Sequence, residues 1–408
     1  MSDIALANAD ETTASTTHLP PADGEAILAN ARAAAGVLQE EAEAGERARR
    51  LTDRAQAALR ATGVFRMSMP RSWSGPEVDL PTQLAIIEAL SAADGSAGWC
   101  AMIGSDGGYI SAALDDHVGR SLYADLDAVT AGWVQPGGEL LPVEGGYLLS
   151  GRWQFASGCA HADVMIGGAM VSRDGRAVVD SDGRPEVRVA VLPADRFDII
   201  DHWNPTGLAG SGSHDYAAHD VLVPADQTFC FGDQQRPGPL YAWPGLFAAH
   251  LVGVPLGIAR AALDDAEALL RDKVLTPSRA RAVDDAHTRA TIARGEAMVG
   301  SARSYAFDVT AAFWATLVAG DEPSLRQRAA LAGCHAHVAR TCRDAVEMVG
   351  DVVGTASIRR EHAVERHRRD LVTLCQHVLI QQRVTELAGA LWLGVADPDD
   401  PRVTNRVL

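Results

Sequence analysis

The hydrophobic pattern changes its period twice along this 408-residue chain, and that change limits the folds open to it. In the first part, apolar residues such as Ile27, Ala31 and Leu38 recur at helical spacing, which predicts amphipathic helices. From about residue 131 to 230 the apolar runs are short, partly alternating and separated by turn residues, which predicts strands. After Pro237 the helical period returns and continues nearly to the end. The predicted order is therefore helices, a β unit, and helices again.

The part before the β unit carries three further helix signals. A helical pattern over 48–62 ends at Gly63, and glycine is the residue that most often follows a helix in the left-handed conformation. A pattern over 80–93 has Pro81 in its first turn, where a missing backbone N–H is tolerated. The stretch 96–114 is unusually apolar and contains several glycines, so we expect a buried helix there.

The remainder is predicted to be strands followed by a helical bundle. Turn residues between the short apolar runs favour an antiparallel β arrangement. Four long helical patterns with short connections favour an antiparallel bundle. The predicted strands are 147–149, 164–166, 187–192 and 216–223, and the predicted helices are 247–272, 279–320, 323–353 and 361–394.

These patterns divide the chain into four parts. Residues 1–22, rich in alanine, threonine and serine, are predicted to be a disordered tail. Residues 23–130 are expected to form a helical domain, 131–236 a β-domain, and 237–408 a C-terminal four-helix bundle. The expected fold class is α+β, mainly α.

The net charge and the cysteine content restrict which molecules the protein can bind and in which cellular compartment we expect it. A net charge of −17, from 36 basic and 53 acidic residues, disfavours nucleic-acid binding, which needs a basic surface, and also disfavours anionic lipid. The sequence lacks a run of about 18 uncharged apolar residues, so we expect no membrane span. The six cysteines lack paired spacing, and the N-terminus lacks the apolar core of a signal peptide. We therefore expect a cytoplasmic protein.

The densest cluster of chemically useful residues is the stretch 151–162, GRWQFASGCAHA. It brings aromatic residues, a serine and a histidine together, which could present an aromatic edge and a hydroxyl to a flat heteroaromatic ligand. A strand with core aromatic residues followed by a turn is the alternative. The stretch 133–138, WVQPGG, is predicted to be a turn beside an aromatic residue and an amide.

Two other stretches restrict the kinds of catalytic and binding site that the sequence can form. In 207–215, GLAGSGSHD, the adjacent Ser, His and Asp cannot form a catalytic triad, because neighbouring strand residues point to opposite faces. The glycine spacing there is also not that of a dinucleotide-binding loop. In 366–378, His377 is predicted to lie on one helical face with Asp370 and Thr373, where a histidine can be a base, a proton donor or a buried core residue. The histidine and carboxylate spacings do not favour a metal centre.

The order of segments and motifs over residues 25–395 resembles the acyl-CoA dehydrogenase fold, with a helical N-terminal domain, a small middle β-barrel and a C-terminal four-helix bundle. In that family the β-domain carries G-x-K-x-W-[IV]-[TS]-[NG], whose hydroxyl contacts flavin N5. Residues 151–158 resemble this motif, with Phe155 at the tryptophan and Ser157 at the hydroxyl. The sequence VQPGG is similar to the family's T-E-P-x-G turn, and DVLVP is similar to its d-V-x-V-P strand end.

The resemblance is incomplete at the catalytic base of the dehydrogenases. Their v-E-r-x-x-R-D motif is matched by 364–370, but the glutamate expected eight residues after the aspartate is Val378, next to His377. Valine cannot remove a proton, and the family's R-x-Q-F-G motif is not visible. With F-x-S-G-C-x-H-A, these departures resemble the type-2 branch, which contains the oxygenase components of two-component flavin-dependent monooxygenases.

That resemblance implies an oxidoreductase that takes reduced flavin (FMN or FAD) from a separate flavin reductase. It would use O2, through a C4a-hydroperoxyflavin, to hydroxylate or N/S-oxygenate a small organic substrate. It implies Ser157 beside flavin N5 and His377 as a base or a proton donor, in a homotetramer. The implied flavin-binding residues are Trp133, Gln135, Pro136, Gly137, Phe155, Ser157 and Gly158, and the implied substrate-pocket residues are Trp99, Ile103, Asp106 and His377.

Two alternatives stay open on the sequence alone. One is an acyl-CoA dehydrogenase-like flavin desaturase with a different base, which tightly bound oxidised FAD, bleached by an acyl thioester, would favour. The other is a flavin-free binding homologue, which failure to bind any flavin would favour.

Overall fold

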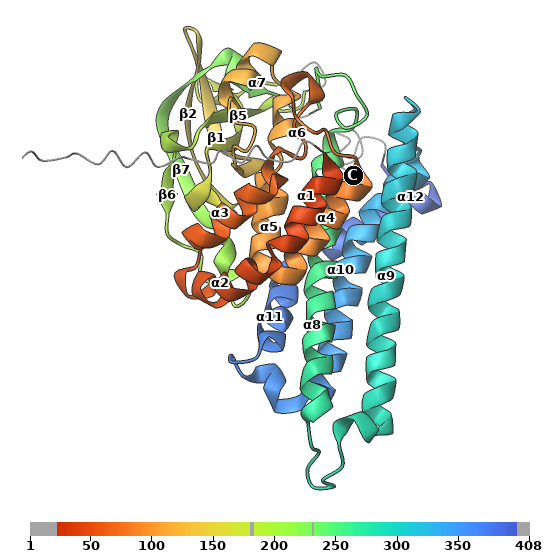
Figure 1. The fold of residues 1–408 in the computed structure, drawn as a ribbon. Helices are drawn as coiled ribbons and strands as arrows, with labels where there is room; N and C mark the ends of the chain where they lie inside the picture. The colour runs from red at the N-terminus through yellow and green to blue at the C-terminus, as the bar shows by residue number, and fades with distance from the viewer. Residues whose placement is uncertain (1–22, 180–182, 231, 398–408) are drawn as a thin grey trace, which may run out of the picture.

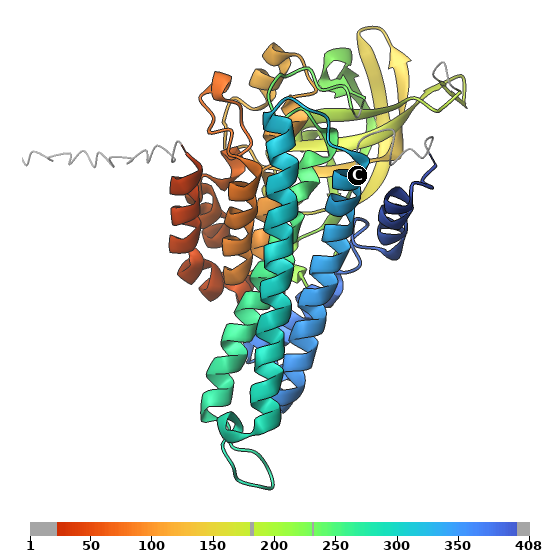
Figure 2. The same cartoon turned by 90° about the vertical axis from the view of Figure 1, so that its right-hand side faces the viewer.

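The computed structural model describes residues 23–179, 183–230 and 232–397, so the predicted tail at 1–22 lies outside the described residues. In Figure 1 the strands lie together at one end of the molecule, with the short N-terminal helices beside them. Long helices from the C-terminal half run side by side and extend well beyond both (Figure 2). The described chain is mainly helical with one mixed sheet, as the predicted α+β class requires.

The helices that precede the sheet follow the capping rules. The predicted helix over 80–93 is present with Pro81 in its first turn, and Gly63 ends another helix with a φ of 80°. The helix predicted from 48 begins later, because Arg49 is left-handed and Thr52 caps the first turn. These helices are α1 (Gly24–Ala33), α2 (Ala35–Ala48), α3 (Asp53–Thr62), α4 (Leu80–Ala93), α5 (Gly95–Gly104), α6 (Gly107–Ser111) and α7 (Asp116–Leu122).

The single helix predicted over 96–114 is wrong, because the chain breaks into α5 and α6 there. At the break, the Ser68 hydroxyl donates to the Ser105 carbonyl and accepts from the Gly108 N–H at 3.1 Å. A Cβ on Gly108 would lie 1.9 Å from the Ser68 carbonyl oxygen, so only glycine allows this approach. Ser68 therefore takes over hydrogen bonds that a continuous helix would make within itself.

The strands form one sheet, and the prediction of a wholly antiparallel unit is wrong. The hairpin of β1 and β2 is antiparallel, but the chain then crosses to the other side of β1, so β3 runs parallel to β1. The order is β6-β7-β2-β1-β3-β5-β8, with β4 beside β3; no pairing among the described residues joins β6 to β8, so hydrogen bonds do not close the predicted barrel. The strands are β1 (Thr130–Val143), β2 (Gly146–Ala156), β3 (Val164–Arg173), β4 (Arg176–Ala177), β5 (Val187–Pro193), β6 (Asp198–Ile200), β7 (His214–Pro224) and β8 (Thr228–Phe229).

Residues 133–138 lie inside β1, so the turn predicted for them is wrong. The pairing with β3 shifts between Trp133 and Pro136, which marks a bulge. A Cβ on Gly137 would lie 2.5 Å from the ring atom Cδ1 of Trp153. The glycines therefore leave room for the buried Trp153 indole.

In the C-terminal half, the helix predicted over 361–394 is also wrong. It is two helices, because Ile380 turns inward between them and is fully buried, while Gln381 is extended. The helix predicted from 279 begins at residue 286, after a cap by Asp285. The C-terminal helices are α8 (Gly253–Asp272), α9 (Ala286–Val318), α10 (Leu325–Val353), α11 (Ala363–Leu374) and α12 (Gln382–Leu393).

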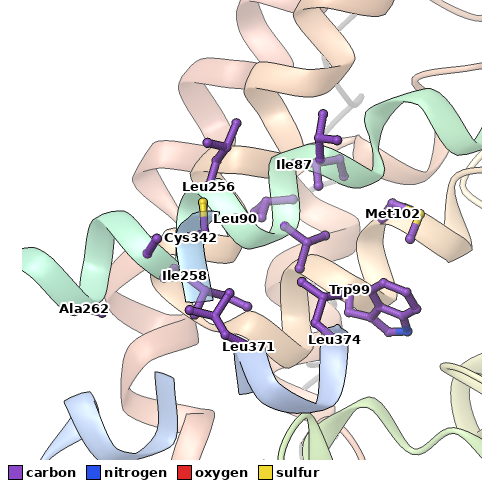
Figure 3. Close-up of a cluster of buried hydrophobic side chains, with 14 of the residues drawn as sticks. Ile87, Leu90, Trp99, Met102, Leu256, Ile258, Ala262, Cys342, Leu371 and Leu374 are labelled. Atoms are coloured by element: carbon purple, nitrogen blue, oxygen red, sulfur yellow. The ribbon is translucent and has the colours of Figure 1, made fainter. Parts of the chain in front are cut away.

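One hydrophobic core joins the N-terminal and C-terminal helices. Figure 3 shows side chains of α4, α5, α8 and α11 meeting in it, among them Leu90, Trp99 and Leu371. The stretch Pro244–Asp272 is long and apolar enough to span a membrane, but 83% of its most apolar window is buried, as in a core helix. The shared core fixes α5 and α11 relative to each other. The domain boundaries drawn from the sequence stay predictions.

Candidate active site

A cavity of about 490 Å³ lies where α5, the sheet, the 203–213 loop and the turn after α11 meet. Its walls are largely apolar and aromatic with a few polar groups, as is typical of a site for a small organic ligand. Six residues predicted from the sequence line it, namely Trp99, Ile103, Trp133, Phe155, Ser157 and His377. The other lining residues are Gly132, Trp203, Pro205, Thr206, Leu208, Ser211, Ser213, Val372, Thr373, Leu374, Gln376, Val378 and Gln381.

Ser157 is the buried polar centre of this cavity. Its Oγ accepts a hydrogen bond from the Trp99 Nε1–H at 2.8 Å and lies 2.7 Å from Ser213 Oγ. Ser213 Oγ lies 2.8 Å from Ser211 Oγ, so three hydroxyls follow one another. Because an indole N–H can only donate, the Ser157 hydroxyl proton can go to Ser213 or to a ligand that accepts a hydrogen bond.

A sharp turn at the end of β2 brings Phe155 and Ser157 to the cavity. Phe155 has a φ of 65°, in the left-handed region that residues other than glycine rarely adopt. Two backbone hydrogen bonds hold the turn, one from the Ser157 N–H to the Phe155 carbonyl (2.9 Å) and one from the Gly158 N–H to the Ser211 carbonyl (2.8 Å). The Phe155 ring is left 55% exposed, edge-on to Trp203 at 6.3 Å between ring centres. Such backbone strain is often retained at functional sites.

His377 lies in the turn after α11, so its predicted alignment on one helical face with Asp370 and Thr373 is wrong. Its Nδ1 accepts a hydrogen bond from the Leu379 N–H at 3.4 Å, and its ring meets the Trp99 indole edge-on at 5.2 Å. Burial, and to a smaller degree the nearby His335, lowers the pKa of His377 to about 4. At neutral pH the ring is therefore uncharged and carries its proton on Nε2.

Two neighbouring residues of α11 hold the loop that forms the opposite wall. The Arg369 guanidinium donates to the Thr206 carbonyl at 2.6 Å and pairs with Glu46 at 2.7 Å. Asp370 Oδ1 accepts from the Leu208 N–H at 2.6 Å, and Leu208 has a φ of 52°. Burial raises the pKa of Asp370 to about 6. The Arg-Asp pair of the sequence motif thus positions the loop and does not itself line the cavity.

The structure places five of the predicted site residues away from the cavity walls. Asp106 lies at the start of α6, beyond the break that ends α5, and burial raises its pKa well above the usual range. Gly137 packs against Trp153, and Gly158 acts through its backbone bond to Ser211. The five residues are Asp106, Gln135, Pro136, Gly137 and Gly158.

Sequence reasoning missed the 203–213 loop as a wall of the site. Its glycines could have indicated a closely packed loop. A Cβ on Gly207 would lie 2.2 Å from the Arg369 carbonyl oxygen, and Gly212 has a φ of 55°. Gly207 brings the loop close to α11, and Gly212 brings it close to Arg49 and Arg50 after α2. Trp203, Ser211 and Ser213 of this loop line the cavity.

The cavity suits the ring system of a flavin. Aromatic side chains supply apolar walls for a flat ring, and Ser157 supplies a hydroxyl for a ring nitrogen. His377 adds a neutral imidazole on the side of α11. Within the described parts of the chain, three His, Cys, Asp or Glu side chains nowhere come close enough together to hold a metal ion.

Comparisons with known proteins agree with this geometry. The family model described as "Acyl-CoA dehydrogenase, C-terminal domain" matches residues 249–382. The indole-3-acetate monooxygenase of Pseudomonas putida is 30% identical over 340 residues, which cover 83% of this chain and 86% of that protein. The flavin-dependent monooxygenase oxygenase subunit HsaA of Rhodococcus jostii is 29% identical over 299 residues, 70% of this chain and 76% of that protein.

Among solved structures, XiaF from Streptomyces sp. in complex with FADH2 and glycerol superimposes with a TM-score of 0.85. The match covers 93% of this chain and 97% of that chain at 21% identity, which shows a common fold. The fold alone does not define the family, but the 30% identity to the Pseudomonas putida enzyme extends over most of both chains and does. This chain belongs to the family of flavin-dependent monooxygenase oxygenase components, within the acyl-CoA dehydrogenase superfamily.

Proposed function

We propose that this chain is the oxygenase component of a two-component system in which a separate reductase supplies the reduced flavin. The observation that carries the proposal is the single cavity at which Ser157, Phe155, Trp133 and His377 meet, although they come from three separate parts of the chain. The relatives named as oxygenase subunits support the division of labour with a reductase. When bound, reduced flavin would supply the two electrons that activate O2, so that one oxygen atom of O2 enters the substrate and the other leaves as water.

Ser157 would orient the flavin ring. Its hydroxyl is fixed by the Trp99 indole at 2.8 Å and by Ser213 at 2.7 Å, so little motion is left to lose on binding. Phe155 and Trp133 would pack against the ring, and Phe155 is already held in a strained conformation that exposes it.

His377 would act as a hydrogen-bond donor through Nε2. Its other nitrogen already accepts the Leu379 N–H, and its pKa of about 4 keeps the ring neutral at physiological pH. A neutral ring with a committed Nδ1 can donate a hydrogen bond at Nε2, but it has no free lone pair for removing a proton. Of the two roles implied by the resemblance, we favour the donor.

The apolar walls would keep water away from the reacting atoms. Trp99 and Ile103 of α5 form one side, and Leu374 and Val378 form another. Water exclusion strengthens the few polar contacts in the site and suppresses side reactions.

The assembly belongs to this proposal as well. The long helices α8, α9 and α10 would form the predicted C-terminal four-helix bundle, with α11 and α12 together in the place of its fourth helix. The bundle would associate into the predicted homotetramer. A cytoplasmic location would give the chain access to reduced flavin from its partner reductase.

Rapid mixing tests the function directly. The chain is mixed anaerobically with reduced FMN or FAD and then with oxygenated buffer, and absorbance is followed. We expect a transient species distinct from oxidised flavin, and Ser157→Ala should shorten its lifetime or weaken flavin binding. Immediate return of oxidised flavin with both cofactors would contradict the proposal. Ser301→Ala, on an exposed face of α9, is the matched control.

A further inference from the structure

We propose that this site selects an uncharged, flat aromatic substrate and rejects one that carries a carboxylate. This inference rests on the proposed function, since it concerns the second ligand of the same cavity.

The charge of the cavity lining carries the argument. Among the described residues, no Asp, Glu, Lys or Arg side chain lines the cavity. Its polar groups are hydroxyls, amides, indoles and His377, which burial keeps neutral at physiological pH. Moving a carboxylate from water into such a site costs free energy that no facing cation returns. A neutral ring with a hydroxyl or N–H loses little, because the serine and amide groups can bond to it.

The side chains of the nearby arginines Arg369, Arg152 and Arg340 make their contacts outside the cavity. Arg369 pairs with Glu365 at 2.6 Å and Glu46 at 2.7 Å, so its charge is balanced where it contacts the loop. Arg152 pairs with Asp215 at 2.7 Å. Arg340 donates to the Ile380 carbonyl at 3.3 Å, on the turn between α11 and α12, while its buried Nε has no hydrogen-bond partner among the described residues. None of these side chains lines the cavity within the described chain.

The aromatic lining indicates that the substrate is a flat aromatic ring. Trp99, Trp133, Phe155 and Trp203 all face the cavity, and aromatic surfaces bind flat rings by stacked or edge-to-face contacts. The volume of about 490 Å³ falls in the range for one drug-sized ligand. A flavin ring would occupy part of this volume, so the second ligand must be small.

This preference would separate the chain from relatives named for indole-3-acetate, a substrate with a carboxylate. At 30% identity the fold is shared, but the choice of substrate is set by the residues that line each site. The same indole ring without its carboxylate is therefore the sharpest probe.

Binding is measured anaerobically, by calorimetry, on the chain loaded with reduced FMN or FAD. Indole and indole-3-acetate are compared at one pH and ionic strength. We expect indole to bind at least tenfold more tightly. Equal or tighter binding of indole-3-acetate would overturn the inference, and so would failure of indole to bind.

A charge added at the cavity provides the second test. Val372, on α11, is 42% exposed and lines the cavity, so it can be replaced by a long side chain without disturbing the core. Val372→Arg should tighten indole-3-acetate binding several-fold, whereas the matched Val372→Gln should not. Tighter binding in both variants, or in neither, would overturn the electrostatic argument. These binding measurements are made without oxygen. Their result can therefore be interpreted even if the protein fails to react with oxygen as the proposed function requires.

Discussion

At the scale of single residues, the backbone occupies one ring nitrogen of His377, and this decides which hydrogen bond the ring can offer a ligand. Nδ1 accepts from the Leu379 backbone, so the proton of the neutral ring stays on Nε2. Burial lowers the pKa to about 4, so the charge of the ring does not change across the physiological range.

A neutral donor predicts a flat pH dependence. Between about pH 5.5 and 8.5, the yield of oxygenated product per flavin oxidised should show no limb that belongs to His377. His377→Gln, which can place an N–H near the same position, should keep most of the yield. In His377→Ala the yield should fall about 100-fold while hydrogen peroxide rises, because one hydrogen-bond donor to the reacting atoms is lost. Single-turnover product analysis measures both. A limb near pH 6.5 that disappears in both variants would instead show a base.

A second histidine, His335 on α10, is buried, and neither of its ring nitrogens has a hydrogen-bond partner among the residues that the structure describes. Burial lowers its pKa to about 4 despite the nearby Ala248 carbonyl. Between pH 6.5 and 4 the unfolded chain therefore binds a proton here that the folded chain does not. The free energy of unfolding must fall as the pH drops through this window.

Replacing this ring by an apolar side chain should remove that pH dependence. His335→Leu should make the melting temperature fall less steeply between pH 6.5 and 4, and at pH 7 it should raise stability by about 1–3 kcal/mol, because a buried unsatisfied group is lost. His337→Leu, two residues along, is the control, since the His337 ring packs on Tyr305. Thermal unfolding followed across pH decides the point, and an unchanged slope in His335→Leu would contradict it.

At the scale of elements, α11 acts as a clamp on the 203–213 loop. Asp370 Oδ1 accepts from the Leu208 N–H at 2.6 Å, and Leu208 is held in a left-handed conformation. Leu208 and the neighbouring Trp203 both line the cavity, and the Trp203 indole donates to the Leu208 carbonyl at 3.3 Å. A side chain outside the cavity thus fixes the shape of one wall.

The role of this contact can be tested with one variant that removes the Asp370 acceptor oxygen and one that keeps an acceptor oxygen. Asp370→Ala should weaken reduced-flavin binding about tenfold, because it leaves the buried Leu208 N–H without its acceptor, which costs about 1–3 kcal/mol. Asp370→Asn keeps an acceptor oxygen and should retain most of the affinity. Anaerobic titration with reduced FMN or FAD gives both values. Equal losses in the two variants would mean that the charge, and not the loop contact, matters.

At the scale of the whole molecule, the sequence predicted the order of helices and strands because hydrophobic period is a local property. It could not predict the break between α5 and α6, which depends on Ser68, a residue far away in sequence. It could not predict that β3 runs parallel to β1, because that depends on where the chain crosses. Ser157 and His377 were found through motifs, while Trp203 and Ser213 were missed because the loop is shaped by its packing against α11.

The predicted homotetramer gives an expectation at the same scale. Trp392, Leu393 and Val395 at the end of α12 are 47%, 78% and 71% exposed, an unusual concentration of apolar surface. Leu393→Asp should therefore shift the assembly to smaller species in analytical ultracentrifugation. Leu222→Asp, on a 51% exposed side chain of β7, is the control. A tetramer that survives Leu393→Asp would place the contact on other surfaces.

The core shared by α4 and α8 also has a consequence for synthesis on the ribosome. About 160 residues separate the end of α4, at 93, from the start of α8, at 253. At roughly 5–20 residues per second, the apolar face of α4 waits roughly 8–32 s for the helix that covers it. During that time the nascent chain exposes a surface that chaperones recognise, so the yield of this protein in a cell should depend on the speed of translation across the β-sheet.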